Sequence, residues 1–392
     1  MKSFHKIHFK NAKSMKALSD ESVDLVVTSP PYPMIEMWDQ IFIKQNARIA
    51  QALKRQDGPL VFELMHRELD KVWTEVFRVV RPGGIACINI GDATRTINSH
   101  FSLYTNHSRI LTYLLGHGFS ALPTILWRKQ TNAPNKFMGS GMMPPGAYVT
   151  LEHEYILILR KGGKREFKTS MDRKGRRESA FFWEERNTWF SDVWLDLKGT
   201  TQKLFDHDTR NRSGAFPFEL AYRLINMFSI KGDVVLDPFL GLGTTMFAAM
   251  AANRNSIGYE MDPAFEDLIK SKLSRVIDLS NTRIRERLKG HRLFIENRYA
   301  DGKTIKHMNK HYQFPVMTKQ ETELLINELK EVKQLKEDSF EVLYSNDPQL
   351  DFVGYDANGI PLRSEQIIFQ KTRGQKKTSP KNRQQGPFDY KR

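Results

Sequence analysis

A short block, Thr28-Ser29-Pro30-Pro31-Tyr32, brings together residue types that suit chemistry on the exocyclic amino group of a nucleobase. Such a nitrogen is a poor nucleophile because its lone pair is delocalised into the ring, so acceptors must hold its hydrogens before it can attack. The Ser29 hydroxyl and the Pro30 carbonyl could both accept, which would polarise the amino group in the transition state. The two prolines stiffen the turn, and the Tyr32 ring offers a stacking face for a base swung out of a duplex. The block therefore predicts an acceptor site for a base amino group.

A glycine-containing loop, Asp237-Pro238-Phe239-Leu240-Gly241-Leu242-Gly243, lies between a short apolar strand pattern and a helix that begins at Thr244. Its glycines let the backbone approach a ligand, and the amides at the helix start point into the same space. Glu260 stands nineteen positions after Gly241, at the end of the next predicted strand, where it can accept hydrogen bonds from ribose hydroxyls. The loop therefore predicts a site for a nucleotide-type cofactor.

Two features distinguish this loop from the sites of nicotinamide dehydrogenases. Met246 stands three positions after Gly243, where the pattern G-x-G-x-x-G has its third glycine. Asp237 would repel a pyrophosphate but tolerates the cationic sulfonium and ammonium groups of S-adenosylmethionine. We therefore expect S-adenosylmethionine as the cofactor, and the alternative is a tight turn with a structural role only.

The 392-residue chain carries a net charge of +15, which favours a polyanionic partner because lysine and arginine release counterions from phosphates. Arg160 to Arg177 holds nine Lys or Arg against two acids, and aromatic residues follow it closely, a combination that suits nucleic acid. A second basic run, Ser364 to Arg392, is equally typical of a disordered tail. The predicted contacts to double-stranded DNA are Arg128, Lys129, Lys164, Arg165, Lys168, Arg173, Lys174, Arg176 and Arg177.

The elements that must position these residues alternate between strand and helix patterns. Apolar runs at 23–27 and 85–90 have the length of buried strands, and a glycine turn at 81–84 precedes the second. The alternation predicts an α/β fold with a doubly wound, mostly parallel sheet and an antiparallel hairpin at one edge. The hairpin strands are expected at 122–128 and 154–160, helices near 40–54, 67–80 and 108–117, and a second α/β unit at 216–262.

The final third of the chain is predicted to be mostly helical, because its apolar residues fall into two stripes. The first stripe is Phe265, Leu268, Ile269, Leu273, Val276 and Ile277, and the second is Leu324, Leu325, Leu329 and Val332.

The composition excludes several classes of protein. No run of about 18 apolar residues suggests a membrane span, and the start of the chain lacks the apolar stretch of a secretory signal, so we expect a cytoplasmic protein. The single cysteine, Cys87, lies in an apolar run and is predicted to be a buried strand residue, which argues against methylation at a ring carbon of cytosine through a cysteine nucleophile. The histidines show no spacing suited to a metal, and we expect none.

The two motifs, in this order, resemble those of the S-adenosylmethionine-dependent DNA amino-methyltransferases of the permuted beta class, in which an S-P-P-Y block precedes an F-x-G-x-G block. The resemblance covers about residues 5 to 262 and implies a Rossmann-like methyltransferase sheet with circularly permuted motif order, followed here by a helical C-terminal region. It implies catalysis by Ser29, Pro30, Pro31 and Tyr32. The cofactor-binding residues implied by the resemblance and by the loop are Asn11, Thr28, Phe216, Pro217, Asp237, Pro238, Phe239, Gly241, Gly243, Thr244, Thr245 and Glu260.

The resemblance also divides the chain into expected regions. They are the catalytic half at 1–160, a DNA target-recognition insert at 161–210, the S-adenosylmethionine-binding half at 211–262, a helical region at 263–363 for DNA recognition or dimerisation, and a basic tail at 364–392. Serine at the start of the block is, in this family, more typical of cytosine-N4 than of adenine-N6 enzymes. The expected function is therefore N4-cytosine methylation of duplex DNA by a monomer or homodimer. The expected functional partner is a cognate restriction endonuclease, which need not be bound. The resemblance also implies a prokaryotic cell, in which the protein is associated with the nucleoid through DNA.

Three alternatives stay open. The nearest is an adenine-N6 DNA methyltransferase. An oxidoreductase using the glycine loop would leave the S-P-P-Y block and the basic charge unexplained, and the third is a non-catalytic nucleic-acid-binding module.

Overall fold

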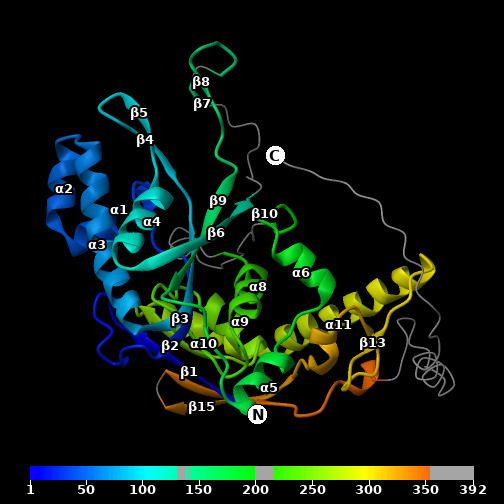
Figure 1. The fold of residues 1–392 in the computed structure, drawn as a ribbon. Helices are drawn as coiled ribbons and strands as arrows, with labels where there is room; N and C mark the ends of the chain where they lie inside the picture. The colour runs from blue at the N-terminus through cyan, green and yellow to red at the C-terminus, as the bar shows by residue number, and fades with distance from the viewer. Residues whose placement is uncertain (130–137, 140, 199–215, 337, 354–392) are drawn as a thin grey trace.

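The computed structural model describes residues 1–129, 138–139, 141–198, 216–336 and 338–353. A ten-stranded sheet forms the centre of this part of the chain, in the order β10-β6-β9-β3-β2-β11-β12-β1-β16-β15 (Figure 1). The five strands from β3 to β1 in this order are parallel, and antiparallel strands flank them on both sides. The strands are β1 (Lys2–Phe9), β2 (Val23–Thr28), β3 (Val80–Ile90), β6 (Phe119–Arg128), β9 (His153–Lys161), β10 (Val193–Trp194), β11 (Val234–Asp237), β12 (Asn255–Glu260), β15 (Leu329–Lys336) and β16 (Ser339–Tyr344).

Helices cover both faces of the sheet, which confirms the doubly wound α/β fold. Alternate residues of the fully buried β2 face opposite sides: Val26 packs with α3 (Gly58–Val79) and α4 (Asn106–Gly116), while Leu25 and Val27 pack with α8 (Phe218–Phe228) and α9 (Thr244–Ala251). Cys87 of β3 is fully buried on the second face, as expected for a strand residue.

The helix expected at 40–54 is two helices, α1 (Asp39–Gln45) and α2 (Ala47–Lys54). Asn46 separates them in extended conformation, and its side chain accepts from the Arg48 amide at 3.1 Å and caps α2.

One end of the sheet differs in two ways from the sequence-based expectation. β1 was not anticipated, and it inserts between β12 and β16. The second apolar stripe is not a helix: Leu324 and Leu325 lie buried in a connecting segment, and Leu329 begins β15, which pairs with β16 in an antiparallel hairpin that extends the sheet. The prediction was wrong here because burial in a loop and in a strand placed the apolar residues at spacings that imitate a helix.

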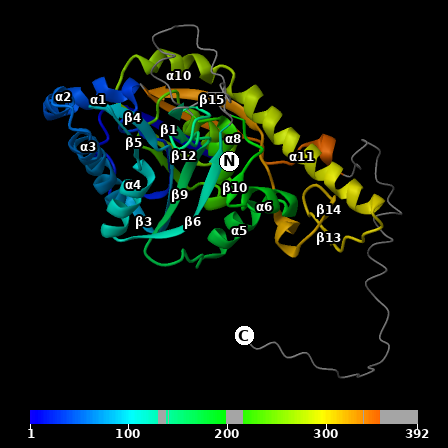
Figure 2. The same cartoon turned by 90° about the horizontal axis from the view of Figure 1, so that it is seen from above.

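The first stripe is helical as predicted, in α10 (Phe265–Leu273) and α11 (Val276–Ala300). Figure 2 shows α11 running along one side of the molecule from β15 towards β13 (His307–Met308) and β14 (Pro315–Val316). Arg287 of α11 is buried and forms two hydrogen bonds of 2.6 and 2.7 Å with Glu185, and a third of 3.0 Å with the Tyr222 hydroxyl. It thereby joins α11 to α6 (Trp183–Trp189) and to α8.

Two hairpins project from the sheet beside β9, at the top of Figure 1. They are β4 (Ala93–Ile97) with β5 (His100–Tyr104), and β7 (Met138–Gly139) with β8 (Ala147–Tyr148). Their rings meet, since Phe101 stacks on Tyr148 with centroids 4.7 Å apart. Within the described residues, none of the helices is long and apolar enough to cross a membrane.

Candidate active site

The two sequence motifs lie side by side at the carboxyl ends of the parallel strands, here called the carboxyl edge. β2 and β11 are hydrogen-bonded neighbours, with Leu25 opposite Val235 and Val26 opposite Leu236. At their ends the Thr28 hydroxyl donates to Asp237 Oδ1 at 2.6 Å. Because both strands end at the same edge, the Ser29–Tyr32 turn and the glycine loop leave the sheet from adjacent points, although about 200 residues separate them.

Asp237 is the buried acid at this junction, with 3% of its surface exposed. Burial raises its pKa to about 6, against the opposing effect of hydrogen bonds from Thr28 and the Phe239 amide. The Thr245 hydroxyl donates to the Val27 carbonyl at 3.2 Å, which ties the start of α9 to β2. In its ionised form the Asp237 carboxylate can attract a cationic ligand that binds at the carboxyl edge.

The glycine loop is held against the end of β12. The Leu240 amide donates to the Tyr259 carbonyl at 2.9 Å, and the Gly241 amide donates to Glu260 Oε2 at 2.8 Å. Gly241 and Gly243 have positive φ angles of 51° and 80°, which side-chain-bearing residues rarely adopt. The turn therefore requires glycine, and it places the Glu260 carboxylate beside the loop.

The remaining predicted cofactor residues lie near the same edge. Asn11 follows β1, and its amide contacts Met261, the neighbour of Glu260, at 3.3 Å. Phe216 and Pro217 are buried and immediately precede α8, which returns to the start of β11 and so begins towards the carboxyl edge. Pro238 and Thr244 flank the loop itself.

Ser29 and Tyr32 take part in a hydrogen-bond network that the motif alone did not predict. The Ser29 hydroxyl donates to Tyr32 Oη at 3.2 Å, and the Tyr32 hydroxyl donates to Glu154 Oε2 at 2.9 Å. Asn89 Nδ2 donates to Tyr32 Oη at 2.9 Å and to Glu154 Oε2 at 2.6 Å, while Lys129 Nζ pairs with Glu154 Oε1 at 2.8 Å. Burial, and then the adjacent Glu154 carboxylate, raises the pKa of Tyr32 well above its ordinary value, so its phenol stays protonated.

Sequence reasoning missed Asn89 and Glu154. Asn89 is a polar residue inside the apolar β3, and Glu154 is an acid near the start of the apolar β9; both are buried, with 2% and 8% of their surfaces exposed. A buried polar residue within an apolar strand run was the one available signal, since such groups need partners.

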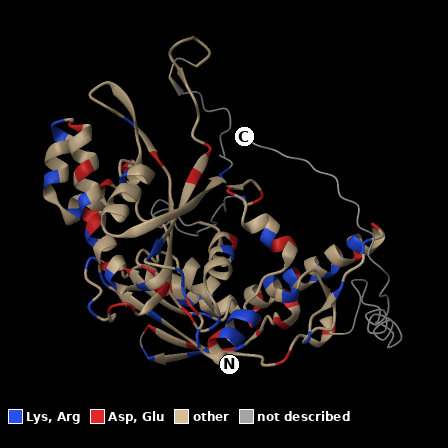
Figure 3. Cartoon of the chain, viewed as in Figure 1, with Lys and Arg blue, Asp and Glu red and all other residues tan. Residues whose placement is uncertain are grey.

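The predicted DNA-binding residues fall into two separate groups. Arg128 is the last residue of β6, and Lys129 follows it, at the carboxyl edge. The others follow β9, which runs antiparallel to β3 and carries the chain to the opposite edge, here called the amino edge. Figure 3 shows this basic cluster on α5 (Ser170–Glu178), on the side of the sheet away from the two hairpins.

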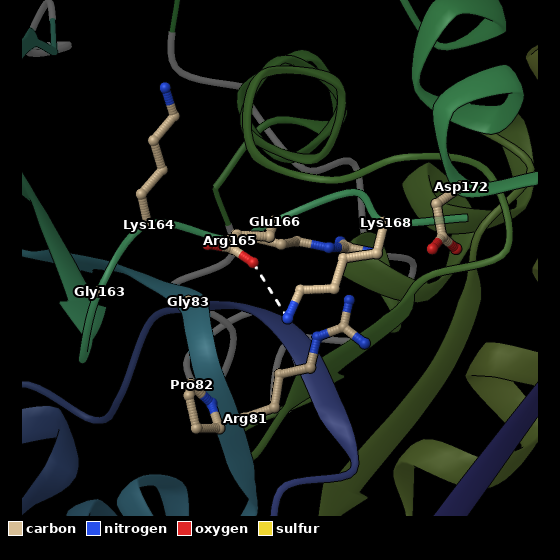
Figure 4. Close-up of a pocket in the computed structure, with 9 residues that line it drawn as sticks. All are labelled: Arg81, Pro82, Gly83, Gly163, Lys164, Arg165, Glu166, Lys168 and Asp172. Carbon is tan, nitrogen blue, oxygen red and sulfur yellow. Dashed lines mark ion pairs between the residues drawn. The ribbon is translucent and has the colours of Figure 1, made fainter. Parts of the chain in front are cut away.

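A cavity of about 480 Å³ lies at the amino edge, lined by Arg81, Lys164, Arg165 and Lys168 among others (Figure 4). Its cations are largely engaged in ion pairs. Arg165 binds Asp233 through two hydrogen bonds of 2.6 and 2.9 Å, and Lys168 lies 3.2 Å from Glu166.

The basic residues of α5 also have partners within the protein. Lys174 lies 3.6 Å from Glu178, and Arg177 lies 2.6 Å from Glu323. Arg173 donates to a backbone carbonyl, and Arg176 stacks on Phe167. The structure does not bring this group together with Ser29 or the glycine loop.

Comparison with known proteins identifies relatives of this chain. A family model described as DNA methylase matches residues 23–271. Type II methyltransferase M.MthZI of Methanothermobacter thermautotrophicus is 54% identical over 345 residues, covering 88% of this chain and 96% of its own. Type II methyltransferase M.MjaI of Methanocaldococcus jannaschii is 50% identical over 282 residues, covering 69% and 91%. Among solved structures, a putative DNA modification methylase from Thermus thermophilus, complexed with S-adenosyl-L-methionine, is 33% identical with a TM-score of 0.54, covering 69% of this chain and 95% of its own.

Proposed function

The chain belongs to the DNA methylase family, and from this premise we propose that it methylates the N4 amino group of cytosine in duplex DNA at the turn that carries Ser29 and Tyr32. The protein is an S-adenosylmethionine-dependent DNA amino-methyltransferase. One observation carries the site assignment: the Thr28–Asp237 hydrogen bond joins the acceptor turn to the glycine loop. A base amino group held at one loop therefore lies next to a methyl donor held at the other.

The residues at the carboxyl edge fit S-adenosylmethionine. Asp237 is a buried acid suited to the cationic end, the Glu260 carboxylate suits the ribose hydroxyls, and the glycine turn leaves room for close backbone approach. The cofactor supplies a methyl group on an electrophilic sulfonium. The chain's own contribution is to hold the amino hydrogens on the Ser29 hydroxyl and the Pro30 carbonyl, and to stack the base on Tyr32.

The choice of cytosine rests on Ser29. A neutral hydroxyl at the first position of the block is more typical of cytosine-N4 than of adenine-N6 enzymes within this family, which leaves N6-adenine as the second candidate. Digestion of DNA methylated by the purified protein, followed by mass spectrometry of the nucleosides, decides between N4-methylcytosine and N6-methyladenine. Sequencing of the modified DNA from expressing cells gives the recognition site in the same work.

Transfer of tritium from labelled S-adenosylmethionine to duplex DNA tests the activity itself. We expect incorporation into DNA that contains the recognition sequence. A folded protein that binds the cofactor but labels no DNA would support the non-catalytic module instead.

The DNA path that fits this site runs along the carboxyl edge. Arg128 is 57% exposed in its side chain, pairs with Glu152 at 3.0 Å at the end of β6, and is placed to contact phosphate. The two hairpins stand on the same side of the sheet (Figure 1), so a duplex lying against them would present a flipped base to the Ser29 turn. We propose α6 and the segment around it, in the 161–210 region, as the part that reads sequence, supported by α11, which Arg287 joins to it.

A protective role beside a cognate restriction endonuclease is proposed from the two relatives, which are both named Type II methyltransferases. Deleting the gene in a host that keeps the endonuclease should be lethal or should select for loss of the endonuclease. Survival with an active endonuclease and unmodified DNA would contradict this role.

A further inference from the structure

The hydrogen-bond network at Ser29 has a direction. Tyr32 Oη accepts from the Ser29 hydroxyl and from Asn89 Nδ2, at 3.2 and 2.9 Å. A phenol has two acceptor lone pairs and one hydrogen, so both acceptor positions are filled and the hydrogen must point elsewhere. It points to Glu154 Oε2 at 2.9 Å. Each hydroxyl therefore donates towards the carboxylate.

We propose that Glu154 is the terminal acceptor of the proton that the target amino group loses on methylation, and that Ser29 and Tyr32 pass the proton to it. This inference rests on the proposed function and adds the route by which the proton leaves. Glu154 acts through two other side chains and does not touch the base, so it is a positioning residue in the reaction.

The proton transfer balances without a further reactant. As the nitrogen lone pair forms the N–CH₃ bond, the sulfonium C–S bond breaks and its electron pair goes to sulfur, which gives a neutral thioether. One N–H proton moves to the Ser29 oxygen, the Ser29 proton moves to Tyr32 Oη, and the Tyr32 proton moves to the Glu154 carboxylate. The products are a neutral methylated amine, Ser29 and Tyr32 in their original protonation states, and a carboxylic acid that later releases its proton to water.

The side chains around Glu154 hold its carboxyl group beside Tyr32. Its side chain is 11% exposed, and Lys129, 46% exposed, lies 2.8 Å from Oε1 on the solvent side. Asn89 fixes Oε2 at 2.6 Å, so the carboxylate cannot turn away from Tyr32. Among the described residues, the other charged or titratable groups near this end of β9 are Glu152 with Arg128, His153, Tyr155, and Asp92 with His107.

Glu154→Gln tests the proposal, because glutamine keeps the shape and can accept from Tyr32 but cannot take up a proton. We expect single-turnover methylation at saturating cofactor and DNA to fall about 10²-fold, as for loss of a general base. Cofactor and DNA affinities, measured by calorimetry and by fluorescence anisotropy, should stay within about twofold of wild type if the site is otherwise intact.

Glu341→Gln is the matched control. Glu341 also lies in a strand, is 11% exposed in its side chain and pairs with a lysine, Lys2, at 2.9 Å, but it belongs to β16. Its replacement should leave the methylation rate unchanged.

Tyr32→Phe provides the second measurement, because it keeps the ring but removes the hydroxyl that would pass the proton from Ser29 to Glu154. If the two residues serve one route, Tyr32→Phe/Glu154→Gln should be no slower than the slower single variant, and the solvent deuterium isotope effect of wild type should shrink in all three. Independent structural roles would instead give losses that multiply to about 10⁴. Multiplying losses, or a Glu154→Gln rate equal to that of wild type, overturns the relay, whereas a wild-type protein that methylates no DNA overturns the proposed function.

Discussion

At the scale of single residues, the Ser29 hydroxyl is expected to act on the rate and not on cofactor binding. Ser29→Ala removes an acceptor that strengthens in the transition state, so turnover should fall about 10²–10³-fold while the Kd for S-adenosylmethionine stays nearly unchanged. Single-turnover kinetics and calorimetry measure the two quantities. Ser22→Ala, just before the other end of β2, is the control. An unaffected rate in Ser29→Ala would remove this residue from the mechanism.

Asp237 predicts a pH dependence of cofactor binding. Its pKa is raised to about 6, so it is mostly protonated at pH 5 and ionised at pH 7.5, and only the ionised form attracts the cationic end of S-adenosylmethionine. The affinity should therefore rise with pH through about 6 and level off above it, with a change of about tenfold between pH 5 and 7.5. Calorimetry at several pH values measures it.

Adenosine is the control for that titration. Adenosine has ribose hydroxyls that Glu260 can bind but no positive charge that Asp237 can attract. The ratio of the affinity for S-adenosylmethionine to the affinity for adenosine therefore measures the contribution of Asp237. In Asp237→Asn the ratio should be low and independent of pH. A ratio that varies with pH in this variant would assign the dependence to another group.

The sequence predicted these residues unequally. The Ser29 turn and the glycine loop are contiguous segments, and their chemistry can be read from residue types. Asn89 and Glu154 reach Tyr32 only because β3 and β9 are neighbours in the sheet, and strand order is not encoded in any local pattern. The acceptor turn was therefore predictable, and its partner carboxylate was not.

At the scale of elements, β1 shows why a strand can escape pattern reading. Its buried positions include Ser3 and His5, at 0% and 1% exposure, while Phe4 is 51% exposed. The polar pair is satisfied by Ser256 and Tyr344 of the neighbouring strands, so the strand is buried through hydrogen bonds on one side. An alternation in which the polar residues face inwards hides the strand from a hydrophobicity argument.

The joint between α11 and α6 gives a stability prediction at the same scale. Arg287→Ala removes the buried arginine from the Glu185 carboxylate, whose side chain is 11% exposed, and should lower the free energy of unfolding by about 3 kcal/mol. Arg285→Ala, two positions away on α11, breaks ion pairs with Glu328 and Asp351 of a side chain that is 41% exposed, and should cost roughly 0–1 kcal/mol. Urea unfolding followed by tryptophan fluorescence compares them. Equal losses would mean that Arg287 does not hold the two helices together.

At the scale of the whole molecule, the path of β9 separates the basic run from the site. The strand spans His153–Lys161, roughly 25 Å at about 3.3 Å per residue, and it leads from the carboxyl edge to the amino edge. The basic residues that follow β9 therefore lie at the amino edge, far from the Ser29 turn. The predicted contacts of Lys164 to Arg177 with DNA would require a duplex at that edge.

Salt titrations of DNA binding distinguish the two edges. Arg128→Glu should weaken binding and reduce the slope of log K against log salt by about one to two. Lys164→Glu/Lys168→Glu at the amino edge should leave both nearly as in wild type, because a duplex of about 20 Å diameter at the carboxyl edge does not reach them. If the amino-edge variant showed the larger loss, the duplex would bind across the opposite face.

The start of β1 lies close to the segment that follows β16. The Met1 amino group donates to Asn346 at 2.8 Å, and this contact is exposed at the surface. A gene rearranged to begin at Gly163 and to connect the segment after β16 directly to β1 would keep every strand of the described sheet and would encode the glycine loop before the Ser29 turn. Because a chain can usually be joined and reopened at surface positions, and Gly162 and Gly163 are exposed, we expect this protein to fold and to label DNA. The order in which the two halves are translated would then have no effect on the folded structure or on its activity.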